Sequence, residues 1–181
     1  MKQFYSCALD PITQSTLKLY LFRNVDNVDV IKENIRTGAW KCAAIKSSLI
    51  LDLFQLVVAA NRAAVAQTLG NMVTRSVYGE ILYNLSLTRN ISQSLALFGA
   101  DGNSPLLLCF LTTAMTDHSE DIVKQVKGDA CPVSNLPEFS DIKLIKDVYK
   151  LKNFECDVDI LDNIISRMVT KNFVSIADVS M

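Results

Sequence analysis

The sequence predicts a single α+β domain in which helices pack mainly on one side of a mixed central β-sheet. Its 181 residues fit one domain, since domains commonly hold about 100–200 residues. Half of the residues are hydrophobic and a fifth are charged, a composition typical of a folded globular chain. Apolar residues recur at both strand and helix periods, which indicates a sheet with packed helices. We expect the domain to span residues 1–173 and the short tail 174–181 to fray.

The strand prediction rests on apolar alternation and on one continuous apolar run. In segment 15–22, leucines occupy every second position from 17 to 21 and share one face. The apolar run at 105–111 is expected of a central strand that is covered on both faces. Segment 79–87 alternates apolar and polar residues, which indicates a half-buried strand. The predicted strands are 4–9, 15–22, 41–45, 79–87 and 105–111.

The helix prediction rests on apolar spacing and on capping residues. The strongest helix is 52–69, where Leu53, Val57, Ala60 and Ala64 fall on one face. Further apolar residues widen that face, so we expect this helix to be among the most buried elements. Segment 131–138 holds two prolines and is predicted to be a loop. The predicted helices are 27–36, 52–69, 90–99, 119–127, a segment that begins at 140, and 159–171.

The charge balance argues against a dedicated nucleic-acid binder. The chain has 18 Lys and Arg residues against 19 Asp and Glu residues, for a formal net charge of −1. Nucleic-acid binders usually carry a strong basic excess, because contacts with phosphates supply most of their affinity. A local basic patch built from Lys41, Arg62, Arg75 and Arg89 stays open as an alternative.

The cysteines and the N-terminus indicate an intracellular protein. The five cysteines are scattered and never form a C-x-x-C pair, so we expect reduced thiols rather than a zinc site or a disulfide framework. The first residues lack the long apolar core of a signal peptide. No stretch reaches the roughly 20 apolar residues that span a bilayer. We therefore expect a cytoplasmic and nuclear location without membrane contact.

The residues that commonly carry catalysis form no recognisable site. His118 is the single histidine and lies in a polar segment between Asp117 and Ser119, where a surface position explains it best. The turn from Gly99 to Gly102 lacks the Gly-Lys-Ser/Thr ending of a phosphate-binding loop. Three acidic residues, at 157, 159 and 162, are explained by the favourable interaction of negative charge with a helix N-terminus. We expect no catalytic residues, no metal and no cofactor.

Six collinear segments give the chain a resemblance to a known family. They are LKLYLF at 17–22, FQLVVAANRA at 54–63, LGNMVTRS at 69–76, EILYNLS at 80–86, IKDVYKL at 145–151 and IISRMVTK at 164–171. Their order and spacing resemble the TPRKB family of PRPK-binding proteins, which are small subunits of the KEOPS (EKC) complex. The chain departs from the family pattern at Leu53, where a proline is common, and at Val73, where a lysine is common.

The resemblance implies a non-catalytic subunit. Family members bind a PRPK-type atypical kinase or ATPase on its N-terminal lobe and meet the other KEOPS subunits indirectly. The complex installs threonylcarbamoyl groups on adenosine in tRNA, and archaeal relatives help to hold the tRNA. We therefore expect an interaction subunit. The alternatives are an RNA-binding module that acts through a basic patch, and a small enzyme that uses His118 or the acidic residues at 157–162.

The last predicted helix supplies the candidate contact with the kinase. Its apolar residues recur over three turns, and two cations lie beside them, as at the rim of an interface. The candidate kinase-binding residues are Leu161, Ile164, Ile165, Arg167, Met168 and Lys171. The alternative is that all of the apolar residues pack inward and the kinase binds elsewhere. For tRNA the candidate residues are Arg62 and Arg75.

Overall fold

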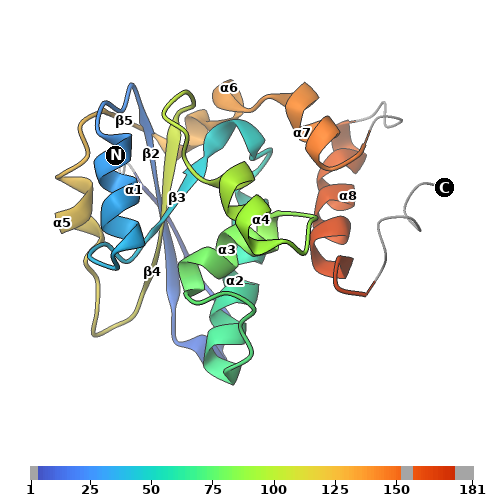
Figure 1. Ribbon diagram of the computed structural model, residues 1–181, viewed down its shortest axis with the longest axis horizontal. Helices are drawn as coiled ribbons and strands as arrows, with labels where there is room; N and C mark the ends of the chain where they lie inside the picture. Colours follow the sequence, from blue (N-terminus) through green and yellow to red (C-terminus); the bar gives the residue numbers. More distant parts are fainter. Residues whose placement is uncertain (1–3, 152–156, 174–181) are drawn as a thin grey trace.

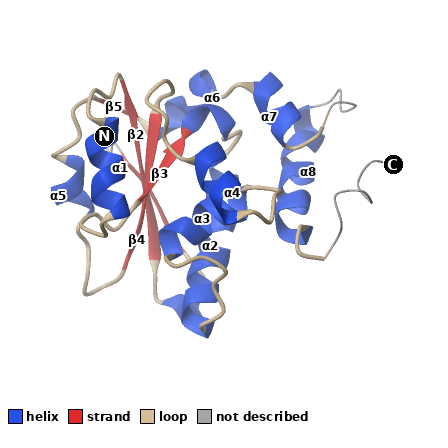
Figure 2. Ribbon diagram, in the orientation of Figure 1, coloured by secondary structure: helices blue, strands red, loops and turns tan. Residues whose placement is uncertain are grey.

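The computed structural model describes residues 4–151 and 157–173, with side chains described from 160 onward in the second range. Within these residues one sheet has the strand order β1-β2-β4-β3, and β5 pairs with β2 beside β1 (Figures 1 and 2). The strands are β1 (Phe4–Ala8), β2 (Thr16–Arg23), β3 (Ala43–Lys46), β4 (Leu106–Thr112) and β5 (Asp129–Cys131). All of their pairings are antiparallel.

Helices cover both faces of this sheet. The α-helices are α1 (Val28–Arg36), α2 (Leu53–Leu69), α3 (Val77–Leu85), α4 (Ile91–Phe98), α5 (Ser119–Val123), α6 (Leu136–Phe139), α7 (Ile142–Val148) and α8 (Asp157–Thr170). Short 3-10 turns are η1 (Pro11–Thr13), η2 (Ser47–Leu49) and η3 (Val133–Asn135). Figure 1 shows α1 and α5 on one face and the remaining helices on the other, with α8 outermost.

The two faces of β2 and β4 build two separate cores. Leu17, Leu19 and Leu21 of β2 belong to the core beneath α2, α3, α7 and α8. The alternate residues Tyr20 and Phe22 belong to the core beneath α1 and α5. Because successive side chains of a strand point to opposite faces, a sheet between two helical layers needs apolar residues at nearly every position.

The predicted α+β class and the helices gathered mainly on one side are confirmed, but the described sheet is antiparallel rather than mixed. The sequence predicts a sheet with packed helices but does not specify the direction of each strand. Here the helical segment between β3 and β4 returns the chain so that β4 runs opposite to β3, with Ala43 facing Cys109. A helical connection does not by itself fix the direction of the next strand.

The strand predicted at 79–87 is wrong, because residues 79–85 belong to α3. Ser76 caps the helix by accepting a hydrogen bond from the Gly79 N–H at 3.0 Å. The polar residues that alternate with the apolar ones, Glu80, Asn84 and Ser86, are buried and form hydrogen bonds. Asn84 Nδ2, for example, donates to the Ala59 carbonyl oxygen at 3.2 Å. A segment that is apolar on several sides and has satisfied polar groups fits a buried helix.

The deep burial predicted for the helix at 52–69 is confirmed. α2 packs against both α3 and α8, and Ala59, Ala60 and Ala63 are fully buried in the core. Small side chains at these positions let neighbouring elements approach α2 closely. Buried Gln55 donates to Tyr149 Oη at 2.8 Å, which ties α2 to the end of α7.

The last part of the chain differs from prediction in detail. Segment 131–138, predicted as a loop, holds the end of β5, the turn η3 and most of α6. The helix predicted at 119–127 ends at Val123. The predicted tail at 174–181 lies outside the described residues. Across the described part of the chain, no helix has both the length and the hydropathy that a membrane span needs.

Candidate functional site

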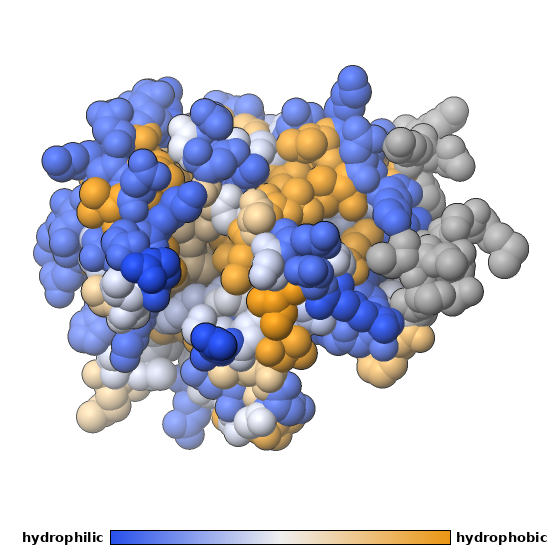
Figure 3. Space-filling model, viewed as in Figure 1, coloured by the Kyte–Doolittle hydropathy of each residue, from blue (hydrophilic) through white to orange (hydrophobic). Residues whose placement is uncertain are grey.

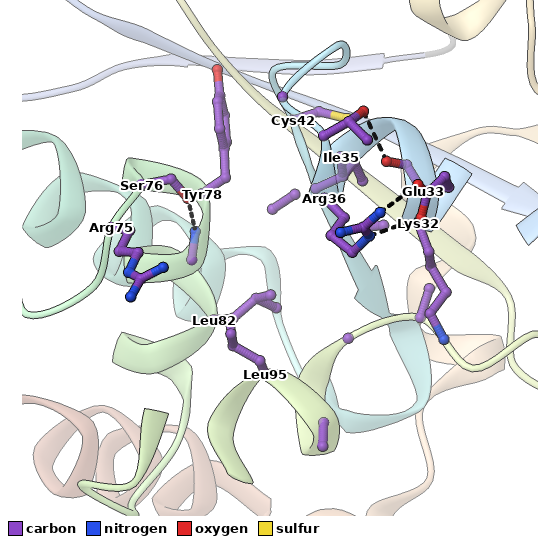
Figure 4. Close-up of a pocket in the computed structure, with 18 of the residues that line it drawn as sticks. Lys32, Glu33, Ile35, Arg36, Cys42, Arg75, Ser76, Tyr78, Leu82 and Leu95 are labelled. Atoms are coloured by element: carbon purple, nitrogen blue, oxygen red, sulfur yellow. Dashed lines mark hydrogen bonds and ion pairs between the residues drawn. The ribbon is translucent and has the colours of Figure 1, made fainter. Parts of the chain in front are cut away.

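A groove of about 890 Å³ runs between α1, the edge strand β3, and helices α3 and α4 (Figure 4). β3 pairs with β4 on one side, and its other side is bridged at Ile45 by Gly99. Cys42, directly before β3, and Ala43 line the groove from that side, although they are 0% and 1% exposed. Tyr78, Leu82 and Leu95 add apolar surface from α3 and α4. The groove therefore has a largely apolar lining beside the edge of the sheet.

Cations stand on opposite walls of this groove. On the α1 wall, Arg36 is held by Glu33 through two hydrogen bonds of 2.8 and 2.6 Å (Figure 4). The hydrogen bond from Arg36 lowers the pKa of the Glu33 carboxyl. Arg75 stands on the opposite wall, is exposed, and forms no ion pair within residues 4–151 and 160–173. Arg75 is therefore available to an anionic ligand in this groove.

The loop that carries Arg75 is held in place by a buried carboxylate. Glu80 of α3 is 3% exposed and accepts hydrogen bonds from the Thr74 N–H and Thr74 Oγ1, both at 2.7 Å. It also accepts from the Val73 N–H at 3.2 Å. These bonds fix the backbone directly before Arg75, so the fold sets the point from which the Arg75 side chain leaves the loop.

The predicted basic patch does not form as expected, because two of its arginines bind the last helix. Arg62 of α2 is half-buried, and its Nη1 donates to the Met168 carbonyl oxygen at 3.4 Å. Arg89 donates to the Lys171 carbonyl oxygen from Nε at 3.0 Å and from Nη2 at 2.9 Å. The C-terminal carbonyls of a helix lack partners within the helix, and cations interact favourably with that end. Arg62 lines a different hollow from Arg75.

Lys171, the second cation of the predicted kinase contact, is also buried and hydrogen-bonded within the fold. Lys171 is 6% exposed, and its ammonium donates to the carbonyl oxygens of Tyr83 and of Ser86, the latter at 3.0 Å. These carbonyls belong to the C-terminal end of α3, so Lys171, directly after α8, caps α3. The same ammonium lies 3.4 Å from the centre of the Tyr83 ring. Lys171 therefore joins two helices and does not form part of an outer rim.

The apolar residues of the predicted kinase contact lie on two sides of α8, one buried and one partly exposed. Ile164 and Met168 are 0% and 1% exposed and lie in the core beneath the helix. Leu161, Ile165 and Arg167 are partly exposed. The alternative of inward packing thus applies to Ile164 and Met168, while the other three remain accessible.

An apolar hollow lies where α2 and α8 meet. It measures about 330 Å³, and its lining includes Phe54, Val57, Val58 and Val169. Phe54 is 52% exposed. Val169 continues the spacing of Leu161 and Ile165, four residues apart, so these three residues form one ridge along α8. Sequence reasoning assigned Phe54 to the buried face of its helix and did not include Val169. No signal in a single sequence separates exposed from buried positions on a helix that is apolar on most sides.

Among the residues considered for catalysis, those with described side chains are engaged in local contacts or lie exposed. Asp117 accepts from Ser119 Oγ at 2.6 Å and pairs with Lys18, while His118 is exposed. Burial alone would raise the pKa of Asp117, but the hydrogen bonds from Lys18 and Ser119 lower it to about 2. Asp162 is exposed, and the side chains at 157 and 159 lie outside the described residues. In the parts of the chain with described side chains, no three potential metal ligands come together.

The buried ammonium of Lys171 predicts that stability depends on pH. Burial first, and then the charge of Arg62, lower its pKa from the ordinary 10.5 to about 7, against the attraction of Glu80. Between these pH values the unfolded chain binds more protons than the folded chain, so stability rises with pH. The free energy of unfolding, measured in urea at about pH 7 and about pH 9, should rise between these pH values in the wild type and rise less in Lys171→Met. Equal rises in both proteins would contradict the assignment.

Comparison with known proteins connects these surfaces to a family. Residues 22–172 match the family described as kinase binding protein CGI-121. The EKC/KEOPS complex subunit TPRKB of Danio rerio is 33% identical over 168 residues, which cover 91% of this chain and 95% of that protein. The EKC/KEOPS complex subunit CGI121 of Yarrowia lipolytica is 28% identical over 145 residues, 78% of this chain and 83% of that protein. The subunit of the same name from Eremothecium gossypii is 31% identical over 77% of this chain and 83% of that protein.

Proposed function

We propose, because the chain belongs to the CGI-121 family of kinase-binding proteins, that it is the kinase-binding subunit of a KEOPS/EKC complex. In this role it binds a PRPK-type atypical kinase, supports its activity, and meets the other subunits through the kinase. Similar proteins are subunits of this complex. We therefore infer that the chain takes part in the threonylcarbamoyladenosine modification of tRNA. We place it in the cytoplasm and the nucleus, where tRNA is made and used. It is a non-catalytic subunit and needs no cofactor of its own.

The observation that carries this proposal is the extent of the family match. It runs from 22 to 172 and so includes β3, β4 and β5, both helical layers and α8. The Danio rerio relative is covered over nearly its whole length. A match of this extent includes the surfaces as well as the core, so the binding function is carried over with the fold. Coexpression with a PRPK-type kinase, followed by affinity purification of the kinase, tests the proposal directly.

We place the kinase contact on the surface where α2 and α8 meet. Phe54 and Val169 offer apolar side chains around one hollow, and Leu161 and Ile165 extend this surface along α8. Arg167 lies beside them at the rim. A few apolar anchors at the centre of an interface commonly carry most of its affinity, which favours a large exposed residue such as Phe54. Ile164, Met168 and Lys171 are buried beneath this surface and hold α8 in place.

A second proposed role is to help hold tRNA in the groove at Arg75. The supporting observation is an exposed guanidinium on a fixed loop, without an ion pair in the described residues, next to an apolar groove. Phosphates and stacked bases bind surfaces of this kind. The net charge of −1 limits the expected affinity, because few phosphates are neutralised.

Arg75→Glu is expected to weaken binding of tRNA by the isolated subunit. The loss of one phosphate contact should lower the slope of log affinity against log salt by about 1. Filter binding or fluorescence anisotropy at several salt concentrations measures this slope. Arg23→Glu is the matched control, since Arg23 is exposed and does not line the groove. An unchanged slope for Arg75→Glu would remove the groove from the tRNA site. Arg62 is a poor probe, since its reversal would disturb α8.

A further inference from the structure

The hollow where α2 and α8 meet holds a charged side chain among its apolar residues. Arg62 lines it together with apolar side chains of both helices, among them Phe54 and Val169. Arg62 is half-buried, so its guanidinium has lost part of its hydration. Another hollow lies between α4 and α7, where Figure 3 shows hydrophobic surface bordered by hydrophilic residues. Lys150, the one cation among the described residues that line that hollow, is exposed. The α2–α8 hollow therefore differs in having its cation partly removed from water.

The contacts of Arg62 within the fold use little of its hydrogen-bonding capacity. A guanidinium carries several N–H donors in a planar fork. Among the described residues, Arg62 donates one hydrogen bond, to the Met168 carbonyl oxygen at 3.4 Å, which is longer than the usual limit of about 3.2 Å. Arg89, in contrast, donates two hydrogen bonds of 3.0 and 2.9 Å to the Lys171 carbonyl oxygen. Arg89 therefore does more to hold the end of α8, and donors of Arg62 remain for another acceptor.

The charges around Arg62 leave a positive excess. Burial lowers the pKa of Arg62, and the charge of Glu80 acts against this effect. The same carboxylate attracts Lys171, whose pKa is lowered by burial and then by the charge of Arg62. Two cations thus share one carboxylate, and Glu80 forms an ion pair with neither among the residues that the structure describes. Asp10 also lines the hollow, but its carboxylate accepts a hydrogen bond from the Ile12 N–H at 3.0 Å and forms no ion pair with Arg62 in this part of the chain. An incoming carboxylate would offset the excess.

We propose that Arg62 receives a carboxylate of the PRPK-type kinase, on a segment whose neighbouring apolar side chain enters the hollow. This inference rests on the proposed kinase contact, because Val169 both lines the hollow and continues the ridge of Leu161 and Ile165. Arginine binds a carboxylate through two parallel hydrogen bonds, which fix the direction of approach. A tRNA phosphate offers a similar acceptor, but it would leave the apolar lining of the hollow uncovered. In the kinase complex the apolar surface supplies affinity, and Arg62 selects and orients the partner.

Replacing Arg62 by glutamine separates this role from the support of α8. Arg62→Gln should weaken binding of the purified kinase to the full-length chain at least about tenfold, because the kinase carboxylate would be left without its partner. Arg89→Gln is the matched control, since Arg89 also holds the end of α8 but does not line the hollow. It should lower the melting temperature more than Arg62→Gln does, yet weaken kinase binding less than about threefold. Calorimetry and isothermal titration measure this inverted order of the two variants.

A double-mutant cycle identifies the carboxylate on the kinase. Each exposed aspartate and glutamate of the kinase is changed singly to asparagine or glutamine. One of these variants should bind the wild-type chain about tenfold more weakly, but Arg62→Gln less than about twofold more weakly. Arg62→Lys keeps the charge and loses the planar fork, so its affinity for the kinase should be intermediate. The same cycle is measured with Arg62→Lys if Arg62→Gln does not fold, and the coupling should again be reduced.

Three results would overturn the proposal while the wild-type kinase complex still forms. The first is that no carboxylate of the kinase is coupled to Arg62. The second is an equal loss of affinity in Arg89→Gln, which would limit Arg62 to the support of α8. The third is weaker tRNA binding with unchanged kinase binding in Arg62→Gln, which would assign this guanidinium to nucleic acid. Failure of the kinase to bind the wild-type chain would contradict the proposed function itself, so the two failures are distinguishable.

Discussion

Replacing Ala60 by glutamate is expected to unfold the protein at temperatures at which the wild type is stable. Ala60 is 0% exposed and lies on α2 within the core beneath the sheet. A carboxylate there would lose its hydration among the apolar residues of this core. Leaving a charge buried and unpaired costs about 3–5 kcal/mol. For a chain of this size the melting temperature should fall by about 10 °C or more.

The control for this experiment lies on the same helix. Gln67 of α2 is exposed, so Gln67→Glu adds the same charge at the surface. Its expected cost is below about 1 kcal/mol, mostly from a negative charge near the C-terminal end of the helix. Differential scanning calorimetry of the two variants separates burial from charge. A melting temperature for Ala60→Glu equal to that of Gln67→Glu would contradict the described core.

Phe54→Asp is expected to abolish copurification of the PRPK-type kinase while the subunit keeps its fold. Phe54 is 52% exposed, so an aspartate at this position stays hydrated and costs the fold little. In the complex the same carboxylate would enter an apolar contact without a partner. Loss of a central aromatic anchor commonly costs 2 kcal/mol or more, about a thirtyfold loss of affinity.

Two further variants make this result specific. Met115 is 94% exposed on the loop before α5, so Met115→Asp is the matched control and should leave the kinase bound. Met168→Asp, which the sequence alone suggests as a probe, should instead lower the stability, since Met168 is 1% exposed. Circular dichroism identifies this difference. A folded Phe54→Asp protein that binds the kinase at full affinity would move the contact away from α2 and α8.

The comparison of α2 with α3 shows what a single sequence can specify. α2 was predictable because its apolar residues include a face at helical spacing and continue over 17 residues, longer than a strand usually runs. In α3, Ile81, Tyr83 and Leu85 alternate as in a strand, while Val77, Ile81 and Leu85 also fit a helix. The choice is made in part by a tertiary partner, the Ala59 carbonyl of α2, to which Asn84 donates. This partner lies on another element and leaves no local signal, whereas the Ser76 cap of α3 is a local signal for a helix.

The candidate sites also depend on tertiary contacts that a single sequence does not show. Periodicity located the last helix correctly but did not show which of its apolar residues face the core. That choice follows from the contacts of Arg62 and Arg89 with carbonyls of the α8 segment, and of Lys171 with those of α3. Each of these cations had suggested a surface role, because lysine and arginine are rarely buried without partners. Arg75 was predicted for the surface and is exposed there.

Isothermal titration of the purified full-length chain with a purified PRPK-type kinase tests the central claim most directly. The account predicts a saturable complex of the two proteins, with an affinity that falls at least about thirtyfold for Phe54→Asp and stays unchanged for Met115→Asp. Absence of measurable binding by the folded wild-type chain would contradict the proposed function.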